Sequence, residues 1–179
     1  KVLVVITEDW FALSHFVPLL TELKALAARV VVATRDSGRL GEIDTLGVEV
    51  RPLDMRRRSL NVSTQMQVRD SLARLIDEER PDVVHAIAMQ PMVVTGLALA
   101  KAGHRPLAVI LHLTGQGYLG HSRSPLAYAL RPLARSVLRR CTSRTPTLLT
   151  AGMRFNCPYS DSSLRGSTER NAPDVASSP

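Results

Sequence analysis

The chain has 179 residues, of which 45% are hydrophobic, so it is long enough to bury the core of one sizeable domain. Its formal net charge of +7 favours an anionic partner such as a phosphorylated substrate, an acidic lipid surface or a nucleic acid, although solvated arginines give the same balance. The two cysteines, Cys141 and Cys157, form no disulfide framework and fit a reducing compartment. No apolar run approaches the ~20 residues needed to span a bilayer, and no signal peptide is visible.

The first predicted strand, residues 2–6, is apolar throughout and β-branched at four of its five positions. Such a run indicates a strand covered on both faces, as at the centre of a parallel sheet. The turn that follows contains four polar side chains, Glu8, Asp9, Ser14 and His15. Because ligands of open α/β sheets bind at the carboxyl edge of the strands, we expect these four side chains to line a binding cleft.

Helices and strands then alternate along the chain. Hydrophobic periodicity predicts helices over residues 16–28, 40–46, 65–79, 92–102 and 125–140, and strands over residues 30–33, 48–53, 82–87 and 107–111. Pro18 is compatible with the first turn of its helix. Alternation with short connections predicts an α/β fold, a doubly wound parallel sheet of the Rossmann-like kind with right-handed crossovers.

The composition changes near Cys141, beyond which the chain is rich in Ser, Thr, Pro, Asn and Arg. After Gly152 the only Val, Ile or Leu residues are Leu164 and Val175, too few to offset the entropy of ordering. We therefore expect one domain over residues 1–140 and a largely disordered tail over residues 141–179. Residues 147–151 are a candidate sixth strand within that tail.

A dinucleotide site is disfavoured because the turn after the first strand, residues 7–12, has no glycine and cannot match the G-x-G-x-x-G fingerprint. Glu8 and Asp9 would also repel a pyrophosphate. Arg35, after the second strand, would suit a phosphate, but it stands alone. No histidine and acid pair has metal-ligand spacing, and no G-x-S-x-G or Cys/His nucleophile motif occurs, so we expect neither a metal nor a cofactor.

His112 directly follows the fifth predicted strand, and the glycine-rich loop that it opens permits a close approach of backbone to a ligand. An imidazole at this edge can donate to a hydroxyl or a phosphate, or transfer a proton, although a histidine satisfied by backbone groups is the alternative. His85, inside the fourth strand, is expected to be structural. We predict His112 as the catalytic candidate, with further substrate contacts from Thr114, Gly115, Gly117 and, after the fourth strand, Gln90.

Two groups of arginines suggest anion binding. Arg56, Arg57 and Arg58 follow the third strand and either hold an anionic acceptor or form a solvated charge run. Arg131, Arg135 and Arg139 form one stripe of the helix over residues 125–140. A basic amphipathic helix is typical of a membrane-surface element, although a core-packed helix with a wet face has the same pattern. No aromatic residue interleaves these charges, which disfavours a nucleic-acid partner.

Three stretches have a familiar order and spacing: ITEDWFALSHFVPL (residues 6–19), ERPDVVHAI (residues 79–87) and HLTGQGYL (residues 112–119). Together they resemble the N-terminal domain of family 4 glycosyltransferases, retaining enzymes of the GT-B fold, of the type that builds capsular polysaccharide or exopolysaccharide. The likeness runs from residue 1 to about residue 140. By this resemblance Ser14 and His15 match the first-loop motif. His112 and residues 115–117 match the loop where related enzymes place catalytic or phosphate-contacting groups, although Gln116 replaces the usual leucine.

The resemblance implies a two-domain enzyme with its active site between the halves. This half would bind a lipid-linked acceptor at the inner face of the cell membrane, in the cytoplasm, and the other half would hold most of the nucleotide-sugar donor. The family's donor domain, with two glutamates eight positions apart, is missing, so we expect a truncated or shifted reading frame near Cys141 and little activity from this chain alone. The alternatives are half of a nucleotide-sugar epimerase, with acid/base groups around Glu8 and His112, and a non-enzymatic remnant.

Overall fold

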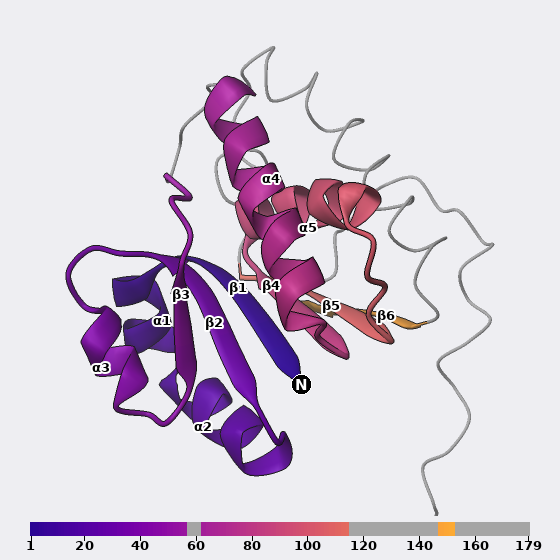
Figure 1. Cartoon of the computed structure of the whole chain (residues 1–179). Coiled ribbons are helices and arrows are strands. Elements are labelled where there is room, and N and C mark those ends of the chain that lie inside the picture. The colour runs from indigo at the N-terminus through magenta and orange to yellow at the C-terminus, as the bar shows by residue number, and fades with distance from the viewer. Residues whose placement is uncertain (57–61, 115–146, 153–179) are drawn as a thin grey trace, which may run out of the picture.

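The computed structural model describes residues 1–56, 62–114 and 147–152, and within them six parallel strands form one sheet in the order β3-β2-β1-β4-β5-β6 (Figure 1). The strands are β1 (Val2–Glu8), β2 (Val30–Arg35), β3 (Glu49–Pro52), β4 (Val83–Ile87), β5 (Ala108–Leu113) and β6 (Thr147–Gly152). The order reverses between β1 and β4, which is the switch point of a doubly wound sheet. The predicted fold class is therefore confirmed.

Helices cover both faces of this sheet (Figure 1). They are α1 (Asp9–His15), α2 (Val17–Leu26), α3 (Leu40–Asp44), α4 (Val62–Glu79) and α5 (Met89–Lys101). One core packs β1 and β2 against α1, α2 and α3 through residues such as Val4, Leu20 and Ile43, and the other packs the opposite face against α4 and α5 through Leu72 and Ala98. All seven residues of β1 are buried, as expected for a strand covered on both faces.

The chain enters its first helix earlier than predicted. The helix starts at Asp9, directly after β1, and is interrupted at Phe16, whose φ of −124° and ψ of 8° are not helical. Pro18 lies in the first turn of α2, as predicted. Its ring would clash with the carbonyl of Ser14 in a continuous helix, so the proline explains the break between α1 and α2.

The sheet extends beyond residue 140, where the sequence analysis placed the end of the domain. The candidate sixth strand is confirmed, because β6 pairs in parallel with β5 from Ala108 opposite Thr147 to Leu113 opposite Gly152. The predicted helix over residues 125–140 and the predicted disorder of residues 153–179 lie outside the described residues. No described helix is long and apolar enough to cross a membrane.

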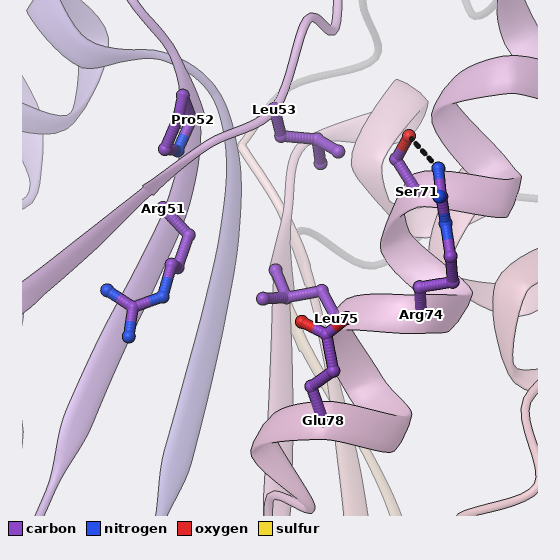
Figure 2. A pocket seen from close by; sticks show the side chains of 7 residues that line it. All are labelled: Arg51, Pro52, Leu53, Ser71, Arg74, Leu75 and Glu78. Atoms are coloured by element: carbon purple, nitrogen blue, oxygen red, sulfur yellow. Dashed lines mark hydrogen bonds between the residues drawn. The ribbon is translucent and has the colours of Figure 1, made fainter.

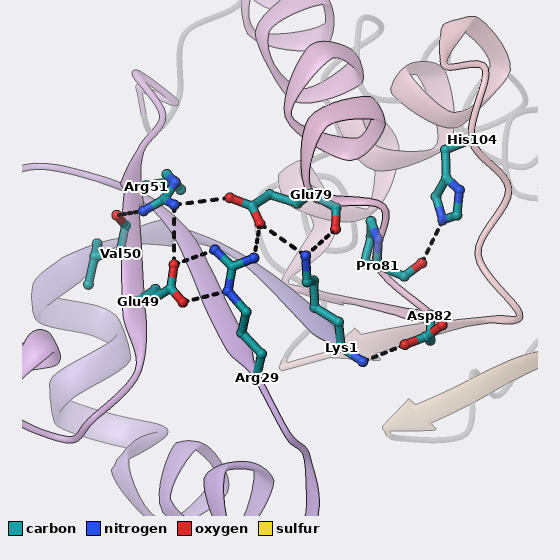
Figure 3. A network of polar contacts seen from close by, with 9 residues as sticks. All are labelled: Lys1, Arg29, Glu49, Val50, Arg51, Glu79, Pro81, Asp82 and His104. Atoms are coloured by element: carbon teal, nitrogen blue, oxygen red, sulfur yellow. Dashed lines mark hydrogen bonds and ion pairs between the residues drawn. The ribbon is translucent and has the colours of Figure 1, made fainter.

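An ionic network ties the end of α4 to the amino edge of the sheet (Figure 3). The carboxylate of Glu79 is 8% exposed, and it lies 3.0 Å from Arg29 Nη1 and 3.1 Å from Arg51 Nη2. Arg29 also pairs with Glu49, and this hydrogen bond lowers the pKa of Glu49 to about 2. Paired in this way, the buried carboxylate of Glu79 is tolerated, and it fixes α4 against β2 and β3.

Candidate functional site at the carboxyl edge of the sheet

A chain of alternating charges lies at the carboxyl ends of β1, β2 and β3. Arg35, the last residue of β2, places Nη1 3.3 Å and 3.4 Å from the two carboxylate oxygens of Glu8, the last residue of β1. Arg35 Nε is 3.6 Å from one oxygen of Asp54, whose other oxygen is 3.4 Å from Arg56 Nε. Glu8 is 5% exposed. The buried Glu8 carboxylate therefore holds the Arg35 side chain in place. The exposed guanidinium of Arg56 ends this chain of charges.

Arg56 is the described arginine at this edge that is best placed to meet an anion. Its side chain is 64% exposed, and so is most of its partner Asp54, so their ion pair contributes little and can exchange for a ligand. Its backbone is held by Gln90, whose Nε2 donates to the Arg56 carbonyl at 3.0 Å. Gln90, predicted as a substrate contact, thus joins α5 to the segment after β3. Arg58 lies outside the described residues.

The carboxylate of Asp9 accepts hydrogen bonds from another segment of the same chain. It is fully buried, and it accepts hydrogen bonds from the backbone N–H of Ser37 at 2.7 Å and of Arg39 at 3.0 Å, and from the Ser37 hydroxyl. Burial raises the pKa of Asp9, but the hydrogen bonds from Ser37, Arg39 and Trp10 outweigh this and hold the pKa below its usual value. The carboxylate therefore fixes the loop before α3. We predicted Asp9 as a substrate ligand from its position after the first strand; its partners in the loop before α3 are distant in sequence and were not foreseen.

A cluster of aromatic rings, here called the ring cluster, spans the same edge from α1 to β5. Its members are Trp10, Phe11, His15, Phe16, His85 and His112. Adjacent rings lie between 5.0 Å and 5.8 Å apart from Trp10 through Phe11 and Phe16 to His112 and His85, with His15 next to Phe11. Phe, Trp and Tyr make up only 4% of the chain, and three of them, Trp10, Phe11 and Phe16, lie in this cluster. Aromatic faces of this kind suit flat, partly apolar ligands.

His112 lies between two other rings. Phe16 meets it edge-on, with centroids 5.7 Å apart and planes at 88°, and His85 stacks on it at 5.6 Å and 16°. The backbone carbonyl of His112 accepts a hydrogen bond of 2.9 Å from the N–H of Ala88. Ala88 has a φ of 79° and a ψ of 161°, a region that glycine favours, so the turn from β4 into α5 is strained. An unfavourable backbone conformation is thus present at Ala88, the residue whose N–H bonds to the carbonyl of His112.

His85 is 5% exposed, and neither ring nitrogen has a hydrogen-bond partner among the described residues. Burial, together with the nearby charge of His112, lowers the pKa of His85 to about 4. The ring is therefore neutral at pH 7. Its burial agrees with the structural role expected from the sequence, but its stacking against His112 was not foreseen.

The other predicted residues are placed as follows. Ser14 is exposed, and its hydroxyl donates to the carbonyl of Trp10 at 2.6 Å. His15 and Thr114 are also exposed. The predicted residues that lie outside the described ranges are Arg57, Arg58, Gly115, Gly117, Arg131, Arg135 and Arg139. Among the described residues, no three His, Cys, Asp or Glu side chains are arranged to hold a metal ion.

Sequence reasoning missed Asp54 and Phe16 as parts of this edge. Asp54 follows β3 directly, so its position after a parallel strand was a usable signal. Phe16 was assigned to a helix core, and only the break before Pro18 turns it toward β5. A pocket of about 190 Å³ also lies between β3 and α4 (Figure 2). Its lining residues are Arg51, Pro52, Leu53, Ser71, Arg74, Leu75 and Glu78, none of which belongs to the predicted site.

Fold and edge together define a Rossmann-like α/β domain. A family model described as "Glycosyl transferase 4-like domain" matches residues 14–153, more than half of the chain. The chain belongs to this family. A comparison with the curated proteins found no significant match.

Solved structures show the same fold at low sequence identity. A Listeria monocytogenes protein provisionally assigned as a UDP-N-acetylglucosamine 2-epimerase has a TM-score of 0.54 at 14% identity, covering 84% of this chain and 39% of its own. MurG from Acinetobacter baumannii has a TM-score of 0.51 at 13% identity, covering 86% and 41%. A glycosyltransferase from Rickettsia africae ESF-5 has a TM-score of 0.50 at 14% identity, covering 70% and 34%. The chain therefore spans less than half the length of each of these three structures.

Proposed function

We propose that this chain is the acceptor-binding half of a retaining glycosyltransferase. The complete enzyme would transfer a sugar from a nucleotide sugar to a hydroxyl of a lipid-linked saccharide during the synthesis of a capsular polysaccharide or exopolysaccharide. The observation that carries the proposal is the position of His112 at the carboxyl edge of a family 4-like domain, within the ring cluster. Arg56, exposed at the same edge, and the arginines that follow it in the sequence support an acceptor with a phosphate group.

Each part of the edge has a role in this proposal. His112, which is half-buried, donates a hydrogen bond to the acceptor or its phosphate. Arg56 binds the anionic group of the acceptor, and Glu8 orients Arg35 beside it. The exposed ring of His15 and the partly exposed rings of Trp10 and Phe11 contact the apolar face of a sugar. The donor diphosphate is stabilised electrostatically, mainly by the other half of the enzyme, without a cofactor.

Calorimetric titration tests the choice of ligand. The probes are a polyprenyl-diphosphate-linked monosaccharide in detergent micelles and UDP-glucose without lipid. The proposal expects the chain to bind the lipid-linked probe and to bind UDP-glucose much more weakly. Arg56→Gln should weaken lipid-linked binding about fivefold, as for the loss of one exposed ion pair, whereas Arg74→Gln, a matched arginine on α4, should have no effect.

The opposite ranking of ligands would favour the epimerase half, and no binding of either probe would favour the non-enzymatic remnant. Neither outcome is compatible with an acceptor-binding half. The proposal also expects the isolated chain to give no turnover with a radiolabelled nucleotide sugar, because the donor-binding groups lie elsewhere. Measurable sugar transfer by the isolated chain would contradict the assignment of donor binding to the other half.

Attachment to the cytoplasmic face of the membrane is part of the proposal. Arg131, Arg135 and Arg139 would contact anionic lipids. Flotation with vesicles containing phosphatidylglycerol should recover the chain, and replacing these three arginines by glutamine should abolish recovery. Arg69, Arg74 and Arg80 replaced together form the control, because this set changes the net charge equally but leaves residues 125–140 unchanged. Equal losses in the two variants would refute specific attachment.

A further inference from the structure

We infer that His85 is a positioning residue for His112, holding the His112 ring in one plane at the carboxyl edge of the sheet by stacking against its face. The functional meaning of this inference rests on the role proposed above for His112. The contact itself does not, so the two can be tested separately.

Strand register places the two rings together. Alternate residues of a strand share a face, so His85 and Ile87 of β4 lie on the same face as Ile110 and His112 of β5. His85 is opposite Ile110, and Ile87 is opposite His112. The two histidines therefore occupy diagonal positions on neighbouring strands, and their side chains meet with ring centroids 5.6 Å apart and planes at 16°.

His112 is held from two further directions. Phe16 meets its ring edge-on at 5.7 Å, from the break between α1 and α2. Its own carbonyl is bonded to the N–H of Ala88, the strained residue after β4. His85 is thus the contact that limits rotation of the ring about its side-chain torsions, since it covers one face of the imidazole. A side chain that cannot rotate loses less entropy when it binds a ligand.

The chemistry of His85 suits this task and not simple core packing. A buried polar ring without partners costs free energy, so an aliphatic side chain would pack this position better. The neutral ring of His85 places no positive charge against His112. An aromatic face also attracts a cation, so the stack is compatible with both the neutral and the protonated forms of His112. Within the described residues, these two histidines are the only pair of imidazoles in contact.

NMR spectroscopy of the histidine ring protons tests the contact in the full chain, without any substrate. The five histidine signals are assigned by replacing each residue with glutamine. In the wild type, cross-relaxation should connect the rings of His85 and His112, and the ring current of His85 should shift His112 protons upfield. His85→Leu should move the His112 signals downfield, whereas His85→Phe, which keeps a planar ring, should retain the upfield position.

Ile87→Val is the control, because it makes a small cavity opposite His112 and leaves the stack intact; the His112 signals should stay in place. Absence of cross-relaxation in the wild type would overturn the inference even if no variant folded. So would unchanged His112 signals in folded His85→Leu, or downfield signals in folded His85→Phe. A confirmed stack combined with no acceptor binding would instead count against the proposed function alone.

Discussion

The buried imidazole of His85 makes the stability of this fold depend on pH, and the size of the effect follows from its surroundings. The folded pKa is about 4, against an ordinary value of 6.5 in an unfolded chain. As pH falls below 6.5, the unfolded chain binds a proton on His85 that the folded chain does not bind until about pH 4. The contribution is therefore fully present above 6.5 and is lost progressively as pH falls toward 4.

The gap between the two pKa values corresponds to a loss of about 3 kcal/mol in the free energy of unfolding over the full window. Between pH 7 and pH 4.5 the loss is about 2 kcal/mol. Urea denaturation at these two pH values measures it, as the free energy of unfolding of the wild type minus that of His85→Phe. The wild type should lose about 2 kcal/mol more than this variant on acidification. His15→Gln, which removes an exposed histidine, should keep the wild-type dependence.

Other groups also titrate in this window, so the comparison depends on the difference between variants and not on the absolute loss. A constant offset caused by the larger phenyl ring cancels in that difference. If His85→Phe loses as much stability as the wild type between pH 7 and pH 4.5, His85 is not buried and neutral, and the reasoning about its environment is wrong. His85→Leu repeats the test if the phenyl ring is not accommodated.

Three further substitutions test the fold around the site, all by urea denaturation. Ala88→Gly should stabilise the chain by about 1 kcal/mol, because relief of the positive φ exceeds the entropy that glycine adds to the unfolded state; destabilisation would contradict the strained turn. Glu79→Gln should lower the free energy of unfolding by about 2 kcal/mol. This loss is smaller than for a fully buried ion pair because Arg29 and Arg51 are more than a third exposed. An unchanged free energy of unfolding would show that the network does not hold α4 against the sheet. Asp9→Asn should cost about 2 kcal/mol at pH 7 and progressively less below pH 4, as the wild-type carboxyl protonates; a constant difference would show that charge is unimportant there.

Most of the framework could be predicted from the sequence, because buried parallel strands and amphipathic helices have strong periodic signals. The apolar run of β1 predicted a central strand, and the strand order placed its neighbours on both sides. The start of α1 could not be predicted in this way. Asp9, Ser14 and His15 resemble loop residues, and the partner that binds Asp9 is the distant loop at Ser37.

The sequence predicted where the site lies in the fold, but few of the side-chain contacts within it. Parallel strands bring their carboxyl ends to one edge, so residues that follow different strands, such as Glu8 and Arg56, were expected along it. The ion pairs that link them through Arg35 were not expected. The stack of His85 on His112 depends on the register between β4 and β5, which local periodicity does not specify. A one-residue shift in that register would send one ring to the opposite face of the sheet.

The central claim is that the carboxyl edge with His112 binds the acceptor, and chemical-shift mapping of the isolated chain tests it most directly. Histidine ring signals are followed while a polyprenyl-diphosphate-linked monosaccharide in micelles is added, with empty micelles as the control. We expect saturable shifts of His112 and the exposed His15, and none of His104, which lies on the loop after α5 and contacts Pro81 near the amino edge. Shifts confined to His104, or no shifts at saturating probe, would contradict it.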